Sequence, residues 1–176
     1  NLTAIAIKDM KSSEKIDLLD GNDIDVKSMV EENCAGFVYG DMTSVAVSED
    51  GSKLAVAIQA ENYADTGRVA LFTCNADGTL TFDKVYETGA QPDMVTFASN
   101  DSKILTADEG EPRDGYGDGI IDPKGTVTII NLADQTVSQV DFTSYDNSDS
   151  REQLVESGVI LKKNTNPSVE DRKSVV

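Results

Sequence analysis

Histidine and tryptophan are absent from this sequence, and cysteine occurs only twice. Without histidine, the chain cannot form a Ser-His-Asp triad, a Cys-His pair or a histidine-ligated zinc site. Two cysteines cannot form a four-cysteine metal site, and they allow at most one internal disulfide. Basic residues are scarce, with 15 Lys and Arg against 32 Asp and Glu in 176 residues, a net charge of −17. That balance argues against nucleic acid and anionic membranes as partners and favours hard cations such as Ca²⁺.

Long apolar runs are missing as well. None approaches the roughly 18 residues that a membrane-spanning helix needs, so we expect no direct membrane insertion of this segment. The length suits one compact domain that buries a sizeable core. The two cysteines, Cys34 and Cys74, follow no spacing rule that would pair them. We therefore expect two free thiols, and a disulfide between them is the alternative.

An internal repeat is the most informative feature of the sequence. The segment 44–57 recurs 50 residues later as 94–107, with matching apolar positions. The segment 67–72 recurs as 125–130, a shift of 58, so the second copy holds 8 extra residues between its second and third strands. Each copy predicts four short strands, rich in Val, Ile, Thr and Phe. The strands are expected at about 44–48, 53–59, 67–74 and 79–87, and at about 94–99, 103–108, 125–132 and 136–142.

A four-stranded meander that repeats every 50 or so residues is typical of a β-propeller blade. The predicted fold is all-β, a β-propeller portion with about two and a half four-stranded antiparallel blades. Two similar hairpin pairs in a sandwich are the alternative. Residues 1–20 are predicted to hold the outer strands of a preceding blade (Leu2–Ile7 and Glu14–Leu19), and 21–40 a polar connection that can form a helix over 24–33. Residues 41–89 form a complete blade in this prediction, and 90–143 a complete blade with an acidic loop insertion. Residues 144–176 would form a short helix and a polar tail leading to a further blade.

The ends of the predicted segment have two consequences. Ser150 to Gln153 resembles a helix-capping box, and Gly158 would close that short helix. A closed propeller needs at least about four blades, so the expected partners are the remaining blades or another copy of this chain. Because the outward faces of the first and last blades expose apolar surface, we expect the segment alone to self-associate.

The segment 108–125 has the densest charge in the chain. It carries six carboxylates against two basic residues and contains the extra residues of the second copy. The loop between the second and third strands of a blade lies on the same propeller face as the loop before the innermost strand. The acids expected to gather on that face, around the channel mouth, are Asp41, Glu61, Asp93, Glu111, Asp114, Asp118 and Asp122.

Crowded carboxylates repel one another unless a cation lies among them, and oxygen ligands with interspersed glycines suit Ca²⁺. The run that begins at Asp114 partly imitates a calcium-binding loop, with acids at positions 1, 5 and 9 and glycine at position 6. It departs at position 3, which is Tyr116, and at position 12, which is Gly125. A solvated acidic loop explains the pattern equally well. The predicted metal ligands are Asp114, Asp118 and Asp122, supported by Glu109, Glu111 and Asp93.

The same acids could serve a hydrolase that pairs a protonated acid with an ionised base. Such a pair needs a specific distance between its two carboxyl groups, which the sequence does not give. Acids that are solvated, or that bind metal without catalysis, explain the acidic segment better. In a metal-dependent phosphoesterase, the metal would polarise the phosphoryl group and activate water. Arg113 could then contact the anionic substrate, whereas a salt bridge to a neighbouring glutamate is its structural alternative.

Five segments carry a resemblance to a known family: Thr43–Ser48, Gly67–Val69, Gln91–Phe97, Thr106–Pro112 and Asp122–Val127. The most specific are the runs Pro-Asp-Met-Val-Thr-Phe and Asp-Glu-Gly-Glu-Pro. These segments resemble the choice-of-anchor I domain family, from about residue 35 to about residue 170. The resemblance implies part of a roughly seven-bladed propeller, at the bacterial cell surface or secreted, held by an anchor absent from this sequence. Some homologues are described as alkaline-phosphatase-like or as mesenchyme-specific cell-surface glycoproteins.

These observations favour a portion of a bacterial cell-surface or secreted β-propeller that acts as a binding or scaffold module. Its functional face would be the acidic, calcium-binding channel mouth. A metal-dependent, alkaline-phosphatase-like phosphoesterase that uses the same face is the alternative. Besides further blades or a second copy, a surface or matrix ligand is the expected partner.

Overall fold

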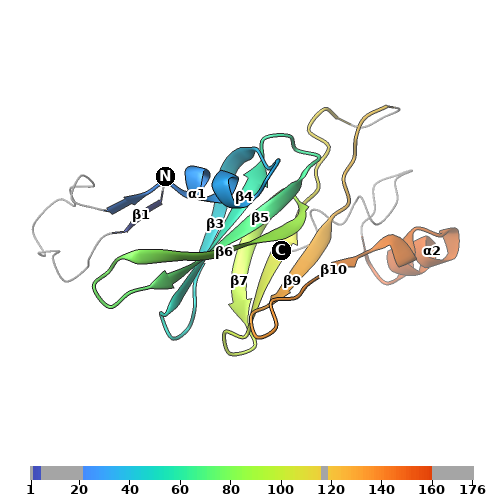
Figure 1. Cartoon of the computed structure of the whole chain (residues 1–176). Coiled ribbons are helices and arrows are strands. Elements are labelled where there is room, and N and C mark those ends of the chain that lie inside the picture. Colours follow the sequence, from blue (N-terminus) through green and yellow to red (C-terminus); the bar gives the residue numbers. More distant parts are fainter. Residues whose placement is uncertain (1, 5–21, 116–118, 160–176) are drawn as a thin grey trace, which may run out of the picture.

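The computed structural model describes residues 2–4, 22–115 and 119–159, and most of this part of the chain is antiparallel β-sheet (Figure 1). It contains a two-stranded sheet and two four-stranded sheets, which confirms the all-β prediction. The elements are β1 (Leu2–Ala4), β2 (Asn22–Ile24), α1 (Val26–Asn33), β3 (Tyr39–Val47), β4 (Lys53–Ala60), β5 (Thr66–Cys74), β6 (Leu80–Ala90), β7 (Pro92–Ala98), β8 (Lys103–Asp108), β9 (Thr126–Asn131), β10 (Val137–Asp141), η3 (Thr143–Tyr145) and α2 (Ser148–Glu156).

The two repeat copies fold as the two meanders that the sequence predicts. In each, the strands pair in chain order, β3-β4-β5-β6 in the first sheet and β7-β8-β9-β10 in the second. Turn chemistry sets the hairpins, because Gly51 and Gly78 have φ of 72° and 86°. Residues other than glycine rarely adopt such positive φ angles. The second copy uses non-glycine residues for the same purpose, and Ser99, Asn100 and Asp101 all have positive φ.

The first sheet is covered on both faces. Its β4 and β5 strands alternate so that one row of side chains faces α1 and the next row faces the second sheet. Phe72 faces α1, is fully buried, and meets the ring of Phe82 edge-on at 5.7 Å between centroids. The buried residues on the α1 side are Val26, Val30, Phe37, Val56, Ile58, Ala60, Ala70 and Phe72. Those between the two sheets are Ala55, Ala57, Val69, Leu71, Tyr86, Val95, Ile104 and Ile130.

One residue connects the two sheets. Ala90 ends β6, Pro92 begins β7, and only Gln91 lies between them. The hydroxyl of Thr43 in β3 donates to the Pro92 carbonyl at 2.5 Å, which ties the innermost strands of both sheets together. Gly67 in β5 lies so close to the Pro92 ring that an added Cβ would overlap it. The two sheets are therefore fixed to each other where the chain passes between them.

The ends of the described chain correct two predictions. β1 pairs with β2, which lies in the segment expected to be a polar connection, while residues 5–7 and 14–19 lie outside the described residues. The expected helix in that connection is confirmed as α1. The capping box at Ser150 was wrong, because α2 begins earlier and the Asn147 side chain accepts the Ser150 N–H at 2.9 Å. Gly158, with φ of 97°, closes the helix as expected.

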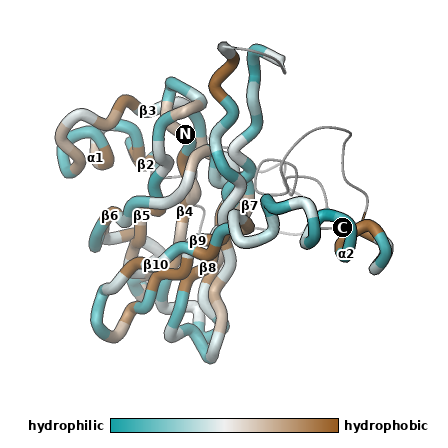
Figure 2. The backbone as a smooth tube through the Cα atoms, turned by 90° about the vertical axis from the view of Figure 1, so that its right-hand side faces the viewer, coloured by the Kyte–Doolittle hydropathy of each residue, from teal (hydrophilic) through white to brown (hydrophobic). Residues whose placement is uncertain are grey.

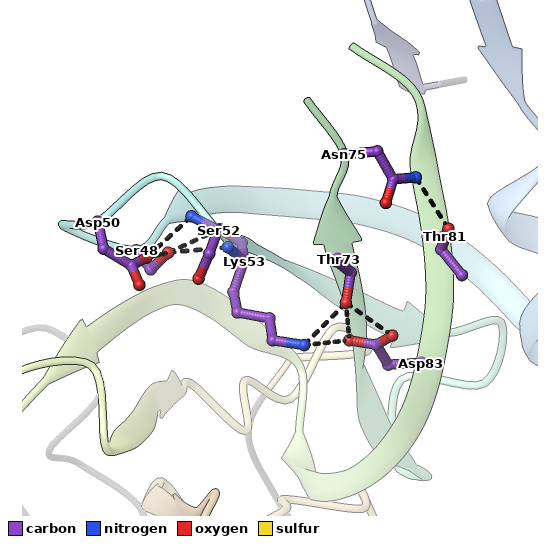
Figure 3. Close-up of polar contacts among 8 residues, drawn as sticks. All are labelled: Ser48, Asp50, Ser52, Lys53, Thr73, Asn75, Thr81 and Asp83. Atoms are coloured by element: carbon purple, nitrogen blue, oxygen red, sulfur yellow. Dashed lines mark hydrogen bonds and ion pairs between the residues drawn. The ribbon is translucent and has the colours of Figure 1, made fainter. Parts of the chain in front are cut away.

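A polar network stabilises the hairpin ends that lie opposite the acidic loop (Figure 3). The Lys53 ammonium lies 2.7 Å from an Asp83 oxygen and 2.8 Å from the Thr73 hydroxyl. In the neighbouring turn, Asp50 accepts the Ser48 hydroxyl at 2.7 Å. It also accepts the Ser52 N–H, and these contacts keep its pKa below the ordinary value. Both hairpin ends are thus held by side chains as well as by strand pairing.

Replacing Asp83 by alanine should lower the free energy of unfolding by about 1 kcal/mol or less, because the ion pair with Lys53 is partly exposed. Urea denaturation of the wild type and the variant measures this. The loss should shrink at high salt, and a loss above about 2 kcal/mol would contradict a screened surface pair.

Candidate functional site

The acidic loop joins β8 to β9, and the structure places its predicted ligands unevenly. Asp114 is exposed, whereas Glu109, Glu111 and Asp122 are half-buried. Asp93 was expected in a loop, but it lies in β7, at an irregularity in the pairing between Pro92 and Met94. Asp118 lies outside the described residues. Among the residues that are described, no three acids or cysteines lie close enough together to hold a metal ion. The ligand set therefore stays a prediction.

A buried glutamine holds the start of the acidic loop, just after β8. Gln91 is 1% exposed and has φ of 55°. Its amide nitrogen donates to the Tyr63 carbonyl at 3.1 Å and to the Glu111 carbonyl at 2.6 Å, and its backbone carbonyl accepts the Glu109 N–H at 2.9 Å. Because Tyr63 belongs to the loop between β4 and β5, Gln91 joins the corresponding loops of both sheets. The sequence analysis did not identify this residue as an anchor.

The Tyr63 hydroxyl contacts the acidic loop at two places, Asp114 and Ile121. It lies 3.1 Å from an Asp114 carboxylate oxygen and 3.2 Å from the Ile121 carbonyl oxygen. One hydroxyl thus contacts an oxygen of a residue that precedes Asp118 in the sequence and an oxygen of a residue that follows it. Burial, followed by the Asp114 carboxylate, raises the pKa of Tyr63, so its hydroxyl remains a donor at neutral pH. A carboxylate and a carbonyl held this way are ligand types that Ca²⁺ accepts.

Arg113 contacts two amide side chains, and its predicted contact with an anionic substrate stays a prediction. Its Nη2 donates to the Gln59 side-chain oxygen at 2.7 Å, and its Nε donates to the Gln91 side-chain oxygen at 3.3 Å. Both acceptors are neutral amides, rather than the neighbouring glutamate that the sequence suggested. The guanidinium thus fastens the acidic loop to β4 and to the connection between the sheets.

Asp108 is the most unusual ionisable group of the described chain, and the sequence analysis gave it no role of its own. It is 3% exposed and lies where β8 and β9 meet Gly89 of β6. Burial raises the pKa of its carboxyl group, while four hydrogen bonds oppose that shift. The donors are the hydroxyls of Thr106 (2.7 Å), Thr126 (2.8 Å) and Thr128 (2.6 Å) and the N–H of Gly89 (3.1 Å).

The repeat itself carried the signal for this buried cluster. Aligning the copies places Asp108 on Ile58, Thr106 on Val56 and Thr128 on Ala70. Three apolar positions of the first copy are therefore polar in the second, while Ile104 and Ile130 keep the rest of that face apolar. Gly89 completes the cluster, because an added Cβ would overlap the Thr126 hydroxyl and crowd Asp108.

A hollow of about 350 Å³ opens between the loop before β3 and the loop between β4 and β5. Phe37 and Val38 line one side, and Asp65 lines the other. The Arg68 guanidinium forms part of its wall, 4.7 Å above the Phe37 ring, and pairs with Glu87 at 3.2 Å. The hollow is at the end of the sheets that also carries the acidic loop.

The profile of the Choice-of-anchor I domain matches residues 2–174, nearly the whole chain. The chain belongs to the choice-of-anchor I domain family. Membership indicates a bacterial surface-associated domain. No curated protein matches the sequence. Among the described residues of this choice-of-anchor I chain, no helix is long and apolar enough to cross a membrane.

Three segments that carry the family resemblance contain residues that join the two sheets. Gln91–Phe97 begins with the buried anchor of the acidic loop, and Thr106–Pro112 includes the buried carboxylate Asp108. Gly67–Val69 contains the glycine that lies against Pro92. In this choice-of-anchor I chain, those motifs therefore set the packing between sheets, in addition to any role of the exposed acids.

Proposed function

We propose that this chain is a binding or scaffold module of a bacterial cell-surface or secreted protein, and that its acidic loop binds Ca²⁺. The observation that carries the proposal is the Tyr63 hydroxyl, which brings the Asp114 carboxylate and the Ile121 carbonyl together. Asp118 and Asp122 are the further ligands in this proposal. Gln91 and Arg113 support the loop from below, so less ordering is needed when an ion binds.

The charge of the chain supports a cation rather than an anion as the ligand. The net charge is −17, and the Arg113 guanidinium donates to the side-chain amide oxygens of Gln59 and Gln91. Neighbouring carboxylates favour a bound cation, which relieves their mutual repulsion. Ca²⁺ suits this loop better than Mg²⁺, because it accepts flexible geometry and mixed carboxylate and carbonyl oxygens.

Calcium titration by calorimetry tests the proposal. The wild type should bind saturably, with a rise in melting temperature, and the variant Asp114→Asn/Asp118→Asn should not bind. Tyr63→Phe should weaken binding by about threefold to tenfold, because it removes one hydrogen bond worth about 1 kcal/mol. Asp134→Asn/Asp149→Asn removes two exposed acids elsewhere and should bind as the wild type does.

Two results would contradict the calcium proposal. One is an absence of binding in a folded wild-type sample, and the other is an equal loss in both double variants, which would indicate diffuse charge attraction. Hydrolysis of a generic phosphoester that is lost in Asp118→Ala would favour an enzyme over a module.

A further inference from the structure

One threonine hydroxyl of the second sheet lies between a buried carboxylate and a side-chain amide. Thr128 of β9 is fully buried, and its hydroxyl donates to Oδ2 of Asp108 at 2.6 Å. The same oxygen accepts the side-chain N–H of Gln139 at 3.4 Å and the backbone N–H of Gly89 at 3.1 Å. Gln139 belongs to β10, the edge strand that lies beside β9 (Figure 2). A hydroxyl, a base and a carboxamide are therefore in contact.

The first sheet has apolar residues at all three corresponding places. By the repeat, Ile58 takes the place of the carboxylate and Ala70 that of the hydroxyl. Val85 pairs with Ala70 across β5 and β6, as the glutamine pairs with the threonine across β9 and β10. A meander of this kind therefore forms without the three polar groups, and strand pairing alone does not require them.

Asp108 is positioned to take the proton of the Thr128 hydroxyl. Its Oδ2 also accepts the Thr126 hydroxyl at 2.8 Å, and its Oδ1 accepts the Thr106 hydroxyl at 2.7 Å. These contacts fix the carboxylate, so that Oδ2 stays on the Thr128 hydroxyl. A hydroxyl is a weak nucleophile until a neighbouring base takes its proton, and that base is effective when further groups orient it.

We propose that Thr128 and Gln139 form an intramolecular ester, which links β9 covalently to β10. Oγ1 of Thr128 attacks the side-chain carbonyl carbon of Gln139, and Asp108 accepts the hydroxyl proton. Asp108 then returns that proton to the leaving amide nitrogen. One C–O bond forms, one C–N bond breaks, and one ammonia is released, so the step needs no oxidant, reductant or further reactant.

The geometry of the strand pair suits this bond. Thr128 and Gln139 lie directly opposite each other in the register of β9 and β10. The Cβ atoms of such a pair are about 4.5–5.5 Å apart, a distance that the chain of atoms through the ester can span. Because Thr128 is fully buried, its oxygen is also shielded from the water that would hydrolyse the product.

The ester would hold an exposed strand in place. All five residues of β10 are exposed, and the strand lies at the edge of its sheet. An edge strand has one side without strand partners, so it is held less firmly than a central strand. A covalent bond to β9 would keep β10 attached under proteolysis or mechanical load, which a surface-associated domain meets outside the cell.

Mass spectrometry of the intact chain tests the proposal. The wild type should be lighter than its sequence mass by one ammonia. Gln139→Glu should have its full mass, because an ionised carboxylate does not react with the hydroxyl. The matched control Gln153→Glu makes the same change at an exposed glutamine of α2 and should keep the loss. Asp108→Asn should form the ester at least about a hundredfold more slowly, since a positioned base contributes about 10²–10⁴-fold.

Digestion locates the bond. Residues 125–150 contain no Lys or Arg, so trypsin leaves Thr128 and Gln139 in one peptide. Cleavage at Asp134 should then release two separate pieces from Gln139→Glu. The two pieces should stay joined in the wild type until mild alkali hydrolyses the ester. An imide formed at an asparagine also loses ammonia, but it would not join the pieces.

Three results would contradict the proposal. A folded wild type that keeps its full mass would overturn it, and so would a loss of ammonia that persists in Gln139→Glu. Equal rates of ester formation in the wild type and in Asp108→Asn would overturn the role of Asp108 as the base. Circular dichroism of each variant shows that it remains folded.

Discussion

Replacement of Asp108 by alanine is expected to lower the free energy of unfolding by about 3–5 kcal/mol, a large share of the 5–15 kcal/mol typical of a domain. The substitution removes the acceptor of four hydrogen bonds in a buried site. Each buried donor left without a partner costs about 1–3 kcal/mol, and the lost side chain leaves a cavity. Urea denaturation followed by circular dichroism measures the loss.

The conservative variant Asp108→Asn separates hydrogen bonding from charge. Its amide oxygen can occupy the position of Oδ2, which accepts from Thr126, Thr128 and Gly89. Its amide nitrogen would then face the Thr106 hydroxyl, which can turn to accept. Because a neutral group is also easier to bury than a charged one, stability should stay within about 1 kcal/mol of the wild type at neutral pH. A loss as large as that of the alanine variant would mean that the charge itself stabilises the fold.

The pH dependence follows from the raised pKa of Asp108. Because the folded state holds this proton more tightly than the unfolded state, the stability gained is complete below the ordinary pKa of about 4. It is lost as the pH rises through the higher pKa of the folded state. Asp108→Asn has no such titration, so its stability relative to the wild type should improve as the pH rises from about 4 to 7. A constant difference would contradict the shift.

Replacement of Gln91 by alanine has the second largest expected effect, a loss of about 2–3 kcal/mol. The change leaves the Tyr63 and Glu111 carbonyls and one donor of Arg113 without their present partner. Hydrogen exchange should also show faster exchange at Glu109, whose N–H bonds to the Gln91 carbonyl. The acidic loop should therefore exchange faster even though the substitution at Gln91 changes no residue of the loop itself.

Gln91→Gly is the informative companion to that variant. It loses the same side-chain contacts, but glycine adopts φ of 55° without the penalty of about 1 kcal/mol that alanine meets there. The glycine variant should therefore be about 1 kcal/mol more stable than the alanine variant. Equal stabilities would show that the backbone at this position is not strained. A loss below about 0.5 kcal/mol in both would show that the anchor is unimportant.

The sequence predicted the sheets well because their periodicity and turn chemistry are local. Most strand ranges, the positive φ of Gly51 and the place of the extra loop follow from residues near one another in the chain. β3 is the exception, because it begins at Tyr39, before the predicted start at about residue 44. The helix start failed on a local choice as well, since Asn147 competes successfully with Ser150 as the cap. The short β2 strand depends on pairing with β1, which a polar sequence does not reveal.

The candidate site was harder to predict, because its decisive contacts join residues far apart in the chain. Tyr63 and Asp114 lie 51 residues apart, and Gln91 reaches two loops at once. Composition drew attention to the exposed acids, whereas the groups that hold the loop are two glutamines, a tyrosine and an arginine. No spacing rule marks such residues before the strands are placed in space.

The polar cluster around Asp108 also solves a problem that any protein built from similar units meets during folding. Repeats with interchangeable faces can pair in the wrong order and become trapped. Here the face of the second unit that receives Gly89 carries Asp108 and Thr128, where the first unit has Ile58 and Ala70. Docked against an apolar partner without that glycine, the carboxylate would be buried with fewer donors, at a cost of several kcal/mol. The two repeated units therefore have different interface residues. Only the native order of packing gives the buried carboxylate of the second unit all of its hydrogen-bond donors.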